Sequence, residues 1–137
     1  MNKAMFSSAT DEWSTPQDFF ERYNSLYAFE VDVCANSNNA KCDSFYDKSK
    51  DGLAQEWTGK CWMNPPYGRE IGKWVKKAAE SKAFVCCLLP ARTDTAWWHE
   101  YVIPKAKHVE FVRGRIKFGG AKNGAPFPSA VVIFDGR

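Results

Sequence analysis

The sequence predicts an α/β fold: a sandwich of helices around a mostly parallel sheet, with an antiparallel pair of strands at one edge. Three observations support this prediction. Short apolar runs alternate with amphipathic helical stretches along the chain. The run AFVCCLLP (83–90) is continuously apolar, which is typical of a central strand covered on both faces. The last two apolar runs have no helical stretch between them, which favours an antiparallel pair.

The first half of the chain predicts a capped helix followed by a strand. Thr15 has N-cap chemistry, Pro16 suits the first helical position, and Asp18 could reach back to the cap. Apolar residues then recur at helical spacing over two turns. The segment FEVDVCAN (29–36) is the predicted strand, and LAQEW (53–57) is expected to form one helical turn.

The second half of the chain predicts two more helices among the strands. Residues 70–80 have apolar positions at helical spacing, with the lysines outward. Thr95 is the expected cap of a second helix, which Pro104 should end. The remaining predicted strands are KCWMN (60–64), VEFVRGRIKF (109–118) and SAVVIF (129–134). Glycine and proline between the last two indicate an irregular loop.

Composition predicts one soluble, unsecreted domain over residues 1–137. Hydrophobic residues make up 45% of the chain and charged residues 26%, as in globular proteins. No apolar run is long enough to cross a bilayer, and no secretory leader opens the chain, so no membrane contact is expected. The five cysteines are an odd number without a C-x-x-C pair, so we expect free thiols and no metal site.

Charge is distributed unevenly along the chain. Residues 1–59 contain 5 Lys/Arg and 10 Asp/Glu, whereas residues 60–137 contain 14 Lys/Arg and 6 Asp/Glu. An acidic half joined to a basic half suggests two different ligands, one of them polyanionic. Ordinary solvated surface is the alternative explanation.

Three predicted strands end in polar or proline-bound residues. These ends are DVCAN (32–36), NPPY (64–67) and LPAR (89–92). Ligands of α/β sheets bind beyond the carboxyl ends of the strands, so the three segments are expected around one site. Asn-Pro is also an ordinary turn opener. NPPY, however, combines several uncommon residues at the ligand-binding end of the sheet, which favours a functional role.

NPPY after a buried strand resembles the catalytic motif of S-adenosylmethionine-dependent amino-methyltransferases. The wider pattern resembles the Dam-like phage and prophage DNA adenine-N6 methyltransferases. The matching segments are WSTP (13–16), FEVDVCA (29–35), NAKC (39–42), DGLAQEW (51–57), NPPYG (64–68), LPARTDT (89–95) and GRIKF (114–118). They cover nearly the whole chain in one order, so the resemblance is far more specific than the tetrapeptide alone.

The resemblance implies a minimal Rossmann-like methyltransferase sandwich that transfers a methyl group from S-adenosylmethionine to a flipped adenine in double-stranded DNA. It also implies a cytoplasmic enzyme of a bacterial cell, encoded by the host or by a phage. A monomer and a weak dimer are both compatible with the sequence.

The implied chemistry explains the residue types in the motif. The adenine amino group is a poor nucleophile, because its lone pair is delocalised into the ring. The Asn64 amide oxygen and the Pro65 carbonyl would each accept one amino hydrogen and stabilise charge developing on the nitrogen. Pro65 and Pro66 fix the backbone and remove competing donors. Tyr67 would supply a ring on which the extruded base stacks.

Cofactor contacts follow from the resemblance, residue by residue. The implied set is Thr15 and Pro16 at the methionine end, Asp32, Cys34 and Ala35 in a shortened first loop, Asp51 near the adenosine, Trp57 as a wall, and Asn64. The chain departs from the larger methyltransferases because it lacks an F-x-G-x-G loop, and residues 1–51 contain no glycine. As alternatives, Thr15 serves only as a helix cap and Trp57 only as core.

DNA contacts are expected from the basic half of the chain. The candidates are Arg92 beyond a strand end and Arg113, Arg115, Lys117 and Lys122 around the glycine-rich loop. These charges could equally form a solvated edge. Trp97 and Trp98 could stack on bases, but tryptophans on an apolar helix face are more often core, and we expect one of the two to be buried.

Two other functions compete with DNA adenine methylation. One is methylation of RNA adenine or of a protein glutamine, since NPPY serves both chemistries, although protein-glutamine enzymes resemble longer chains with the glycine-rich loop. The other is a non-catalytic relic of the fold that only binds DNA. Retention of Asn64 and Tyr67 disfavours the relic, whereas the missing glycine loop favours it.

Overall fold

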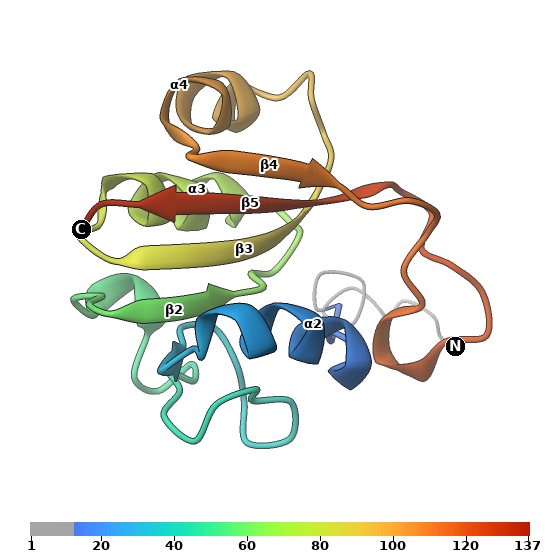
Figure 1. The fold of residues 1–137 in the computed structure, drawn as a ribbon, viewed down its shortest axis with the longest axis horizontal. Coiled ribbons are helices and arrows are strands. Elements are labelled where there is room, and N and C mark those ends of the chain that lie inside the picture. The colour runs from blue at the N-terminus through green and yellow to red at the C-terminus, as the bar shows by residue number, and fades with distance from the viewer. Residues whose placement is uncertain (1–12) are drawn as a thin grey trace.

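The computed structural model describes residues 13–137, and residues 1–12 of the predicted domain lie outside the described part of the chain. The strands are β1 (Val31–Asp32), β2 (Lys60–Met63), β3 (Phe84–Pro90), β4 (His108–Phe111) and β5 (Ser129–Asp135). The helical segments are α2 (Gln17–Tyr27), η2 (Gly52–Ala54), α3 (Ile71–Glu80), η3 (Trp98–Val102), α4 (Ile103–Lys105) and η4 (Phe118–Gly120). Their arrangement is shown in Figure 1.

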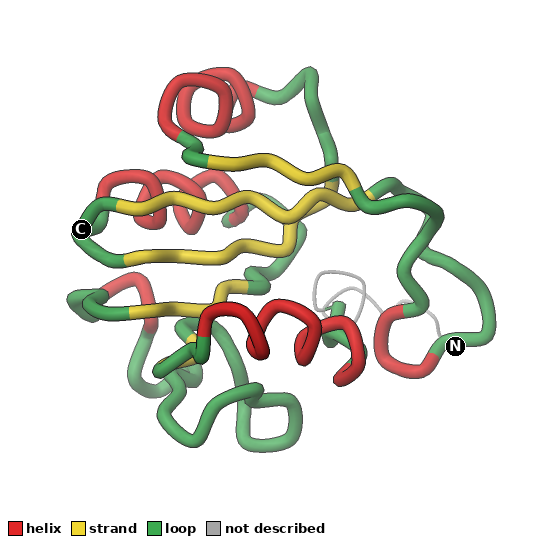
Figure 2. The backbone as a smooth tube through the Cα atoms, viewed as in Figure 1, coloured by secondary structure: helices red, strands yellow, loops and turns green. Residues whose placement is uncertain are grey.

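The five strands form one sheet in the order β1-β2-β3-β5-β4. Strands β1, β2 and β3 are parallel, and β5 runs antiparallel to both of its neighbours, β3 and β4. Strand β4 therefore points in the same direction as β1, β2 and β3. This arrangement confirms the prediction of a mostly parallel sheet with an antiparallel pair at one edge. Helix α2 lies in front of the sheet and α3 behind it (Figures 1 and 2).

Strand β3 forms the centre of the core. All seven of its residues are buried, as its continuous apolar run predicted. Helix α3 buries the apolar face that its spacing predicted, and its Lys73 and Lys76 are exposed. Lys77 lies over the ring of Trp57, 5.4 Å from its centroid.

Two predicted strands are shorter than expected. Strand β1 has two residues rather than spanning 29–36, because the Asp32 carboxylate accepts the Cys34 N–H and turns the chain. Strand β4 ends at Phe111 rather than reaching residue 118. The backbone N–H of Val112 makes a last bond to Ser129, and the chain then turns at Gly114, whose φ is +78°.

The helix ends also differ from the sequence-based expectation. Pro16, not Thr15, is the N-cap of α2, and no side chain caps that helix. Asp18 does not reach back, because its carboxylate accepts the N–H of Phe19. Thr95 does cap its helix, since its hydroxyl accepts the N–H of Trp98. Pro104 lies within the last turn rather than ending the helix, after a π-helical segment whose wider turn accommodates a residue without an N–H.

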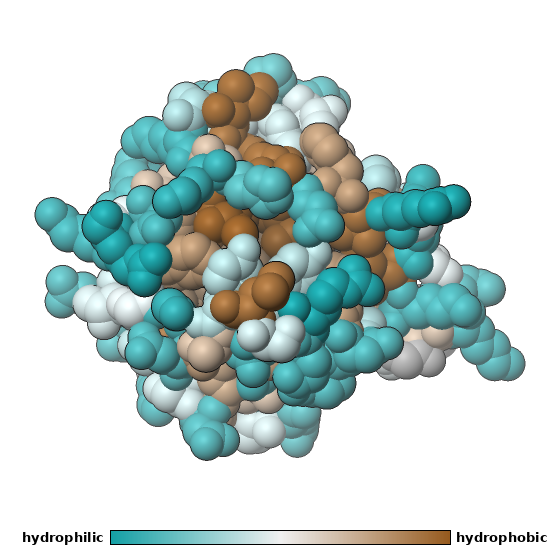
Figure 3. Space-filling model, in the orientation of Figure 1, coloured by the Kyte–Doolittle hydropathy of each residue, from teal (hydrophilic) through white to brown (hydrophobic). Residues whose placement is uncertain are grey.

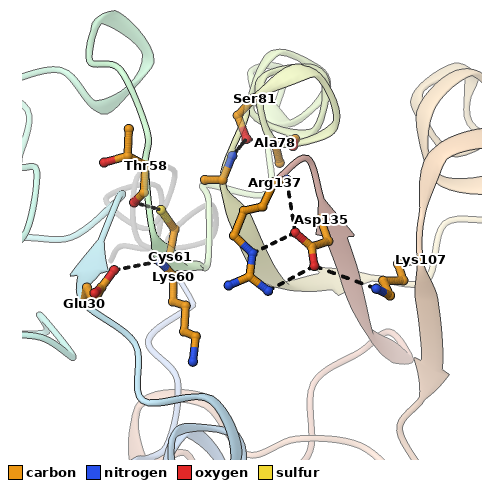
Figure 4. A network of polar contacts seen from close by, with 10 residues as sticks. Glu30, Thr58, Lys60, Cys61, Ala78, Ser81, Lys107, Asp135 and Arg137 are labelled. Carbon is orange, nitrogen blue, oxygen red and sulfur yellow. Dashed lines mark hydrogen bonds and ion pairs between the residues drawn. The ribbon is translucent and has the colours of Figure 1, made fainter.

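The two ends of the sheet differ in character. At the end where β2 begins and β5 finishes, Asp135 bonds Arg137 at 2.9 and 3.1 Å, and Glu30 accepts the Lys60 N–H (Figure 4). These contacts close that end around the C-terminus.

Among the described residues, every helix is too short or too polar to cross a bilayer.

Apolar side chains also reach the surface. On the face shown in Figure 3, apolar atoms gather over β4 and β5, above α2. Leu26, Ile103 and Phe111 are the large apolar residues with exposed side chains in the described part of the chain. Phe111 stacks on Trp98 and is otherwise open to solvent, with 63% of its surface exposed.

Candidate active site

A cavity of about 580 Å³ opens beyond the carboxyl ends of β1 and β2. Its volume lies in the range of small-molecule sites, about 300–1,000 Å³. Eight of the residues predicted to bind cofactor or substrate line it: Thr15, Asp32, Cys34, Ala35, Asp51, Asn64, Pro65 and Pro66. The structure therefore brings most of the predicted site together at one end of the sheet.

Asn64 follows the last residue of β2, and its side chain is held in one orientation. Its Nδ2 donates to the carbonyl of Trp13 and to the hydroxyl of Thr15, 2.9 Å away. Its Oδ1 is buried and has no hydrogen-bond partner within the described residues. A buried acceptor without a partner is costly, so this oxygen is suited to a donor supplied by a ligand. Thr15 thus supports Asn64 rather than capping α2.

Asp32 places a carboxylate on the wall of the cavity. The residue is only 2% exposed, and its two oxygens accept the backbone N–H groups of Cys34 at 3.2 Å and Lys41 at 3.0 Å. Burial raises its pKa to about 7, although both hydrogen bonds oppose that shift. A cationic ligand beside this carboxylate would favour its ionised form.

A tight loop forms another part of the cavity rim. Asp51 has a positive φ of 55°, and its carboxylate accepts the Leu53 N–H. Gly52 packs so closely that a Cβ there would lie 2.1 Å from the Val33 carbonyl oxygen. This glycine lets the loop approach the end of β1, which brings Asp51 to the cavity. Hydrogen bonds from Ser49 and Lys50 hold the pKa of Asp47, on the same rim, below its usual value.

Aromatic side chains form the apolar wall. Trp62, Trp74 and Tyr46 line the cavity. Trp57 does not, which corrects the prediction that it walls the pocket. It is 2% exposed, its indole N–H donates to the Gly52 carbonyl, and its ring stacks on Trp74 at 6.2 Å. Trp57 therefore lies behind Trp74 and supports the wall from the core.

Tyr67 is not the accessible ring that the motif predicted. It is only 3% exposed, and its hydroxyl donates to the Leu88 carbonyl at 2.8 Å. Phe118 and Phe127 pack against the ring edge-to-face, at 6.2 and 5.6 Å between centroids. The ring is therefore covered in this conformation. Its hydroxyl, to which the sequence assigned no role, makes a buried hydrogen bond.

Arg92, which was predicted to contact DNA, lies beside the motif. Its Nη1 donates to the carbonyl of Tyr67 at 3.1 Å, and its side chain is half-buried. The backbone carbonyl of Arg92 accepts the Thr95 hydroxyl, so the segment after β3 is itself fixed. The Arg92–Tyr67 bond and the Tyr67–Leu88 bond together connect the motif to the end of β3 at two points.

A second cleft, of about 550 Å³, lies between α2 and the segment after β4. Arg113, Arg115 and Lys117 line it, and so does Pro16, which therefore lies outside the main cavity, where it was predicted to bind cofactor. None of the three cations forms an ion pair with another residue in 13–137, although Arg115 donates to the Ala125 carbonyl. Lys122 is exposed in the loop that follows.

Trp97 and Trp98 are both buried, which corrects the expectation that only one of them belongs to the core. Trp97 is 9% exposed and Trp98 is 4% exposed. The two rings meet edge-to-face, with 5.7 Å between their centroids, at the start of a π-helical segment. Neither ring is available for stacking on a base.

Several cavity residues were not predicted from the sequence. They are Trp13, Ser14, Asn36, Asn39, Lys41, Tyr46, Asp47, Lys48, Ser49, Gly52, Leu53, Trp62, Glu70 and Trp74. For some of them the sequence did contain a signal, since Trp13, Ser14, Asn39 and Lys41 lie in the segments WSTP and NAKC that resemble the Dam-like family. Trp74 gave none, because its helical spacing indicated core, and it is both 7% exposed and part of the cavity wall.

The chain is similar to known methyltransferases. The family model described as DNA N-6-adenine-methyltransferase (Dam) matches residues 3–133. A DNA N-6-adenine-methyltransferase of Haemophilus phage HP1 is 28% identical over 141 residues, covering 93% of this chain and 80% of the relative. The putative methyltransferase YfdM of Escherichia coli K12 is 34% identical over 65 residues, covering 42% of this chain and 71% of the relative.

Proposed function

Because the chain belongs to the DNA N-6-adenine-methyltransferase (Dam) family, and is an adenine-specific DNA methyltransferase, we propose that its main cavity binds S-adenosylmethionine. The family implies this methyl donor, and three features of the cavity suit it. The volume of about 580 Å³ is sufficient, the wall carries aromatic rings, and the carboxylates of Asp32, Asp47 and Asp51 suit a ligand with cationic and hydroxyl groups.

Each part of the cavity then has a task. Asp32 pairs with the positive charge at the methionine end of the donor and is held for this by the N–H groups of Cys34 and Lys41. Asp47 and Asp51, on the loop that precedes η2, accept hydrogen bonds from ribose hydroxyls. Trp74, supported by Trp57, packs on the adenosine ring.

Asn64 carries the catalytic assignment. When bound, S-adenosylmethionine supplies an electrophilic methyl group on a sulfonium. The Asn64 Oδ1, buried and without a partner, accepts one hydrogen of the adenine amino group, and the Pro65 carbonyl accepts the other. Asn64 cannot rotate away, because its Nδ2 is engaged by Trp13 and Thr15. The residue acts by orientation and charge stabilisation and not as a base, since a carboxamide has no useful proton affinity.

DNA is proposed to approach the carboxyl end of β2. Strand β4 points in the same direction as β2, so the cations that follow it leave the sheet at the same end as Asn64. Arg113, Arg115 and Lys117 in the second cleft and Lys122 in the adjoining loop contact backbone phosphates. Arg92 holds the Tyr67 backbone and is removed from the set of phosphate contacts.

Labelled methyl transfer tests the proposal directly. The purified protein is incubated with methyl-tritiated S-adenosylmethionine and unmethylated plasmid DNA, RNA or a protein mixture in parallel. We expect label only in DNA, and only in N6-methyldeoxyadenosine after digestion to nucleosides. Label in RNA or in glutamine would transfer the function to one of the other chemistries. Absence of S-adenosylmethionine binding in a calorimetric titration would contradict the cavity assignment.

A further inference from the structure

The two groups that should meet the adenine are both covered. Tyr67 is 3% exposed, and the Asn64 Oδ1 is buried although no described residue bonds to it. An adenine amino group can reach the Asn64 oxygen only if part of the surrounding structure moves. The covering side chains are therefore part of how substrate enters.

Three aromatic residues, here called the aromatic cover, close this region: Trp13, Phe118 and Phe127. Phe127 packs edge-to-face on Tyr67 at 5.6 Å and on Trp13 at 5.1 Å. The backbone carbonyl of Trp13 in turn accepts a hydrogen bond from the Asn64 Nδ2. The cover thus contacts both ends of the motif, Asn64 and Tyr67.

Two of the three rings of the aromatic cover lie in the basic loop. Phe118 and Phe127 flank Lys122, and Lys117 directly precedes Phe118. The Gly119 N–H donates to the Ser14 carbonyl at 2.9 Å, which joins this loop to the segment before α2. The residues proposed to contact phosphate and two of the three covering rings therefore belong to one stretch of chain.

Two glycines give this loop backbone conformations that other residues rarely adopt. Gly114 and Gly119 have φ values of +78° and +59°, and a Cβ at either position would meet nothing within 4 Å. Phe127 is itself half-buried, with exposed neighbours Pro126 and Pro128. Displacing Phe127 toward solvent would therefore disturb the ring contacts described above but not the sheet.

We propose that the aromatic cover closes the adenine pocket in the free enzyme and that Phe127 is the side chain the incoming adenine displaces. The inference rests on the proposed function, since it assumes that Tyr67 and Asn64 receive the base. Phosphate contacts made by Lys117 and Lys122 favour the open arrangement, so backbone binding and base entry are coupled. Closure lowers the apparent affinity for the base in proportion to the fraction of molecules that are open.

The test separates affinity for the base from affinity for the backbone. Binding of a labelled oligo(dA) strand is compared with binding of an abasic strand of equal length. The Kd of the abasic strand divided by the Kd of oligo(dA) measures how much the base adds to affinity. Phe127→Ala should raise this Kd ratio about tenfold, because the ring contacts of a closed cover no longer oppose entry of the base. Phe127→Leu, which keeps apolar volume, should give a smaller gain in the same direction and serves if the alanine variant does not fold.

Leu26→Ala is the control, since Leu26 is exposed on α2 and lines neither cleft nor the aromatic cover. It should leave the ratio unchanged. An unchanged ratio in both Phe127 variants would overturn the proposal, and a lower ratio would show that Phe127 stacks on the base rather than covers its pocket. Failure of the proposed function would look different: the wild-type enzyme would transfer no methyl group to DNA.

Discussion

β1 with the chain after it (residues 31–53) and the chain after β4 (residues 112–128) leave the sheet at the same end, but from its two opposite edge strands, and different interactions hold them in place. The first segment is fixed by backbone bonds, including reciprocal contacts of Asp32 with residues 44 and 46, and by a carboxylate that binds two N–H groups. The second contains two glycines with positive φ and exposed cations.

This difference corresponds to the two ligands. A cofactor cavity gains from preorganisation, because groups already in place lose little freedom on binding. A surface that must accept a nucleic acid and admit one base gains from adjustable contacts. On the proposed function, the acidic side is the preorganised one and the basic side the adjustable one, with Asn64 between them.

Asn64→Ala should have the largest effect on activity, because this residue connects the two sides. It removes the only described acceptor that is buried and unpartnered in the cavity, so the methyl-transfer rate should fall about 100-fold or more. It also frees the Trp13 carbonyl and the Thr15 hydroxyl, so a small fall in melting temperature should accompany the loss. Single-turnover transfer to plasmid DNA measures the rate, and a variant with wild-type rate would refute the assignment.

Asp32→Asn tests the acidic side through pH. The pKa of Asp32 is raised from 3.8 to about 7 in the folded protein, so the carboxyl is largely protonated below pH 7. A cationic ligand needs the carboxylate, so cofactor affinity should fall about tenfold per pH unit below pH 7 and level off above it. The asparagine variant should bind weakly with no such dependence. Calorimetric titration over this pH range gives the answer.

The same shift has a consequence for the free protein. Ionising a buried carboxylate without a cationic partner is unfavourable, so this group should lower stability as pH rises from about 4 to about 7. Below that window the carboxyl is protonated in both states and contributes no penalty. Saturating cofactor should reverse the trend, and thermal unfolding with and without it would detect the reversal.

Arg92→Ala tests the connection between β3 and the motif. Loss of the bond to the Tyr67 carbonyl should lower kcat about tenfold while KM for cofactor stays constant, because Arg92 positions the motif and does not line the cavity. Millimolar guanidinium should restore part of the rate. A change in the salt dependence of DNA binding, with kcat intact, would instead return Arg92 to the phosphate contacts.

Much of the fold could be predicted because local pattern and tertiary structure agree. The continuous apolar run of β3 and the helical spacing of α3 each determine one element, and the absence of a helix before β5 determines the antiparallel pair. Two of the three predicted strand ends, DVCAN and NPPY, do converge on the main cavity, as expected of parallel strands, whereas LPAR does not line it.

The errors arise where contacts join distant segments. Tyr67 is covered by Phe118 and Phe127, some fifty and sixty residues later, and nothing near the motif indicates this. Trp57 and Trp74 stack on each other, and the sequence does not indicate that Trp74 lines the cavity while Trp57 lies behind it.

Tyr67→Phe tests whether the hydroxyl has a structural role. Its bond to the Leu88 carbonyl is buried, so losing it leaves an unsatisfied acceptor and should destabilise the protein by about 1–3 kcal/mol. The methyl-transfer rate of the folded variant should change much less than that of Asn64→Ala. Urea unfolding measures the difference, and equal stability would show that the hydroxyl is dispensable.

The smallest effect is expected on the basic side. Replacing Arg115 and Lys117 with glutamine removes two phosphate contacts, each of which contributes about 0.9 to the slope of log affinity against log salt. The slope should therefore become shallower by about two, and affinity at low salt should fall several-fold. Cofactor binding should not change, because neither residue lines the main cavity. Glutamines at Lys73 and Lys76, exposed on α3, provide a control with the same loss of charge. If the control alters the slope as much as the test variant does, the cations after β4 form an ordinary solvated surface and do not bind DNA.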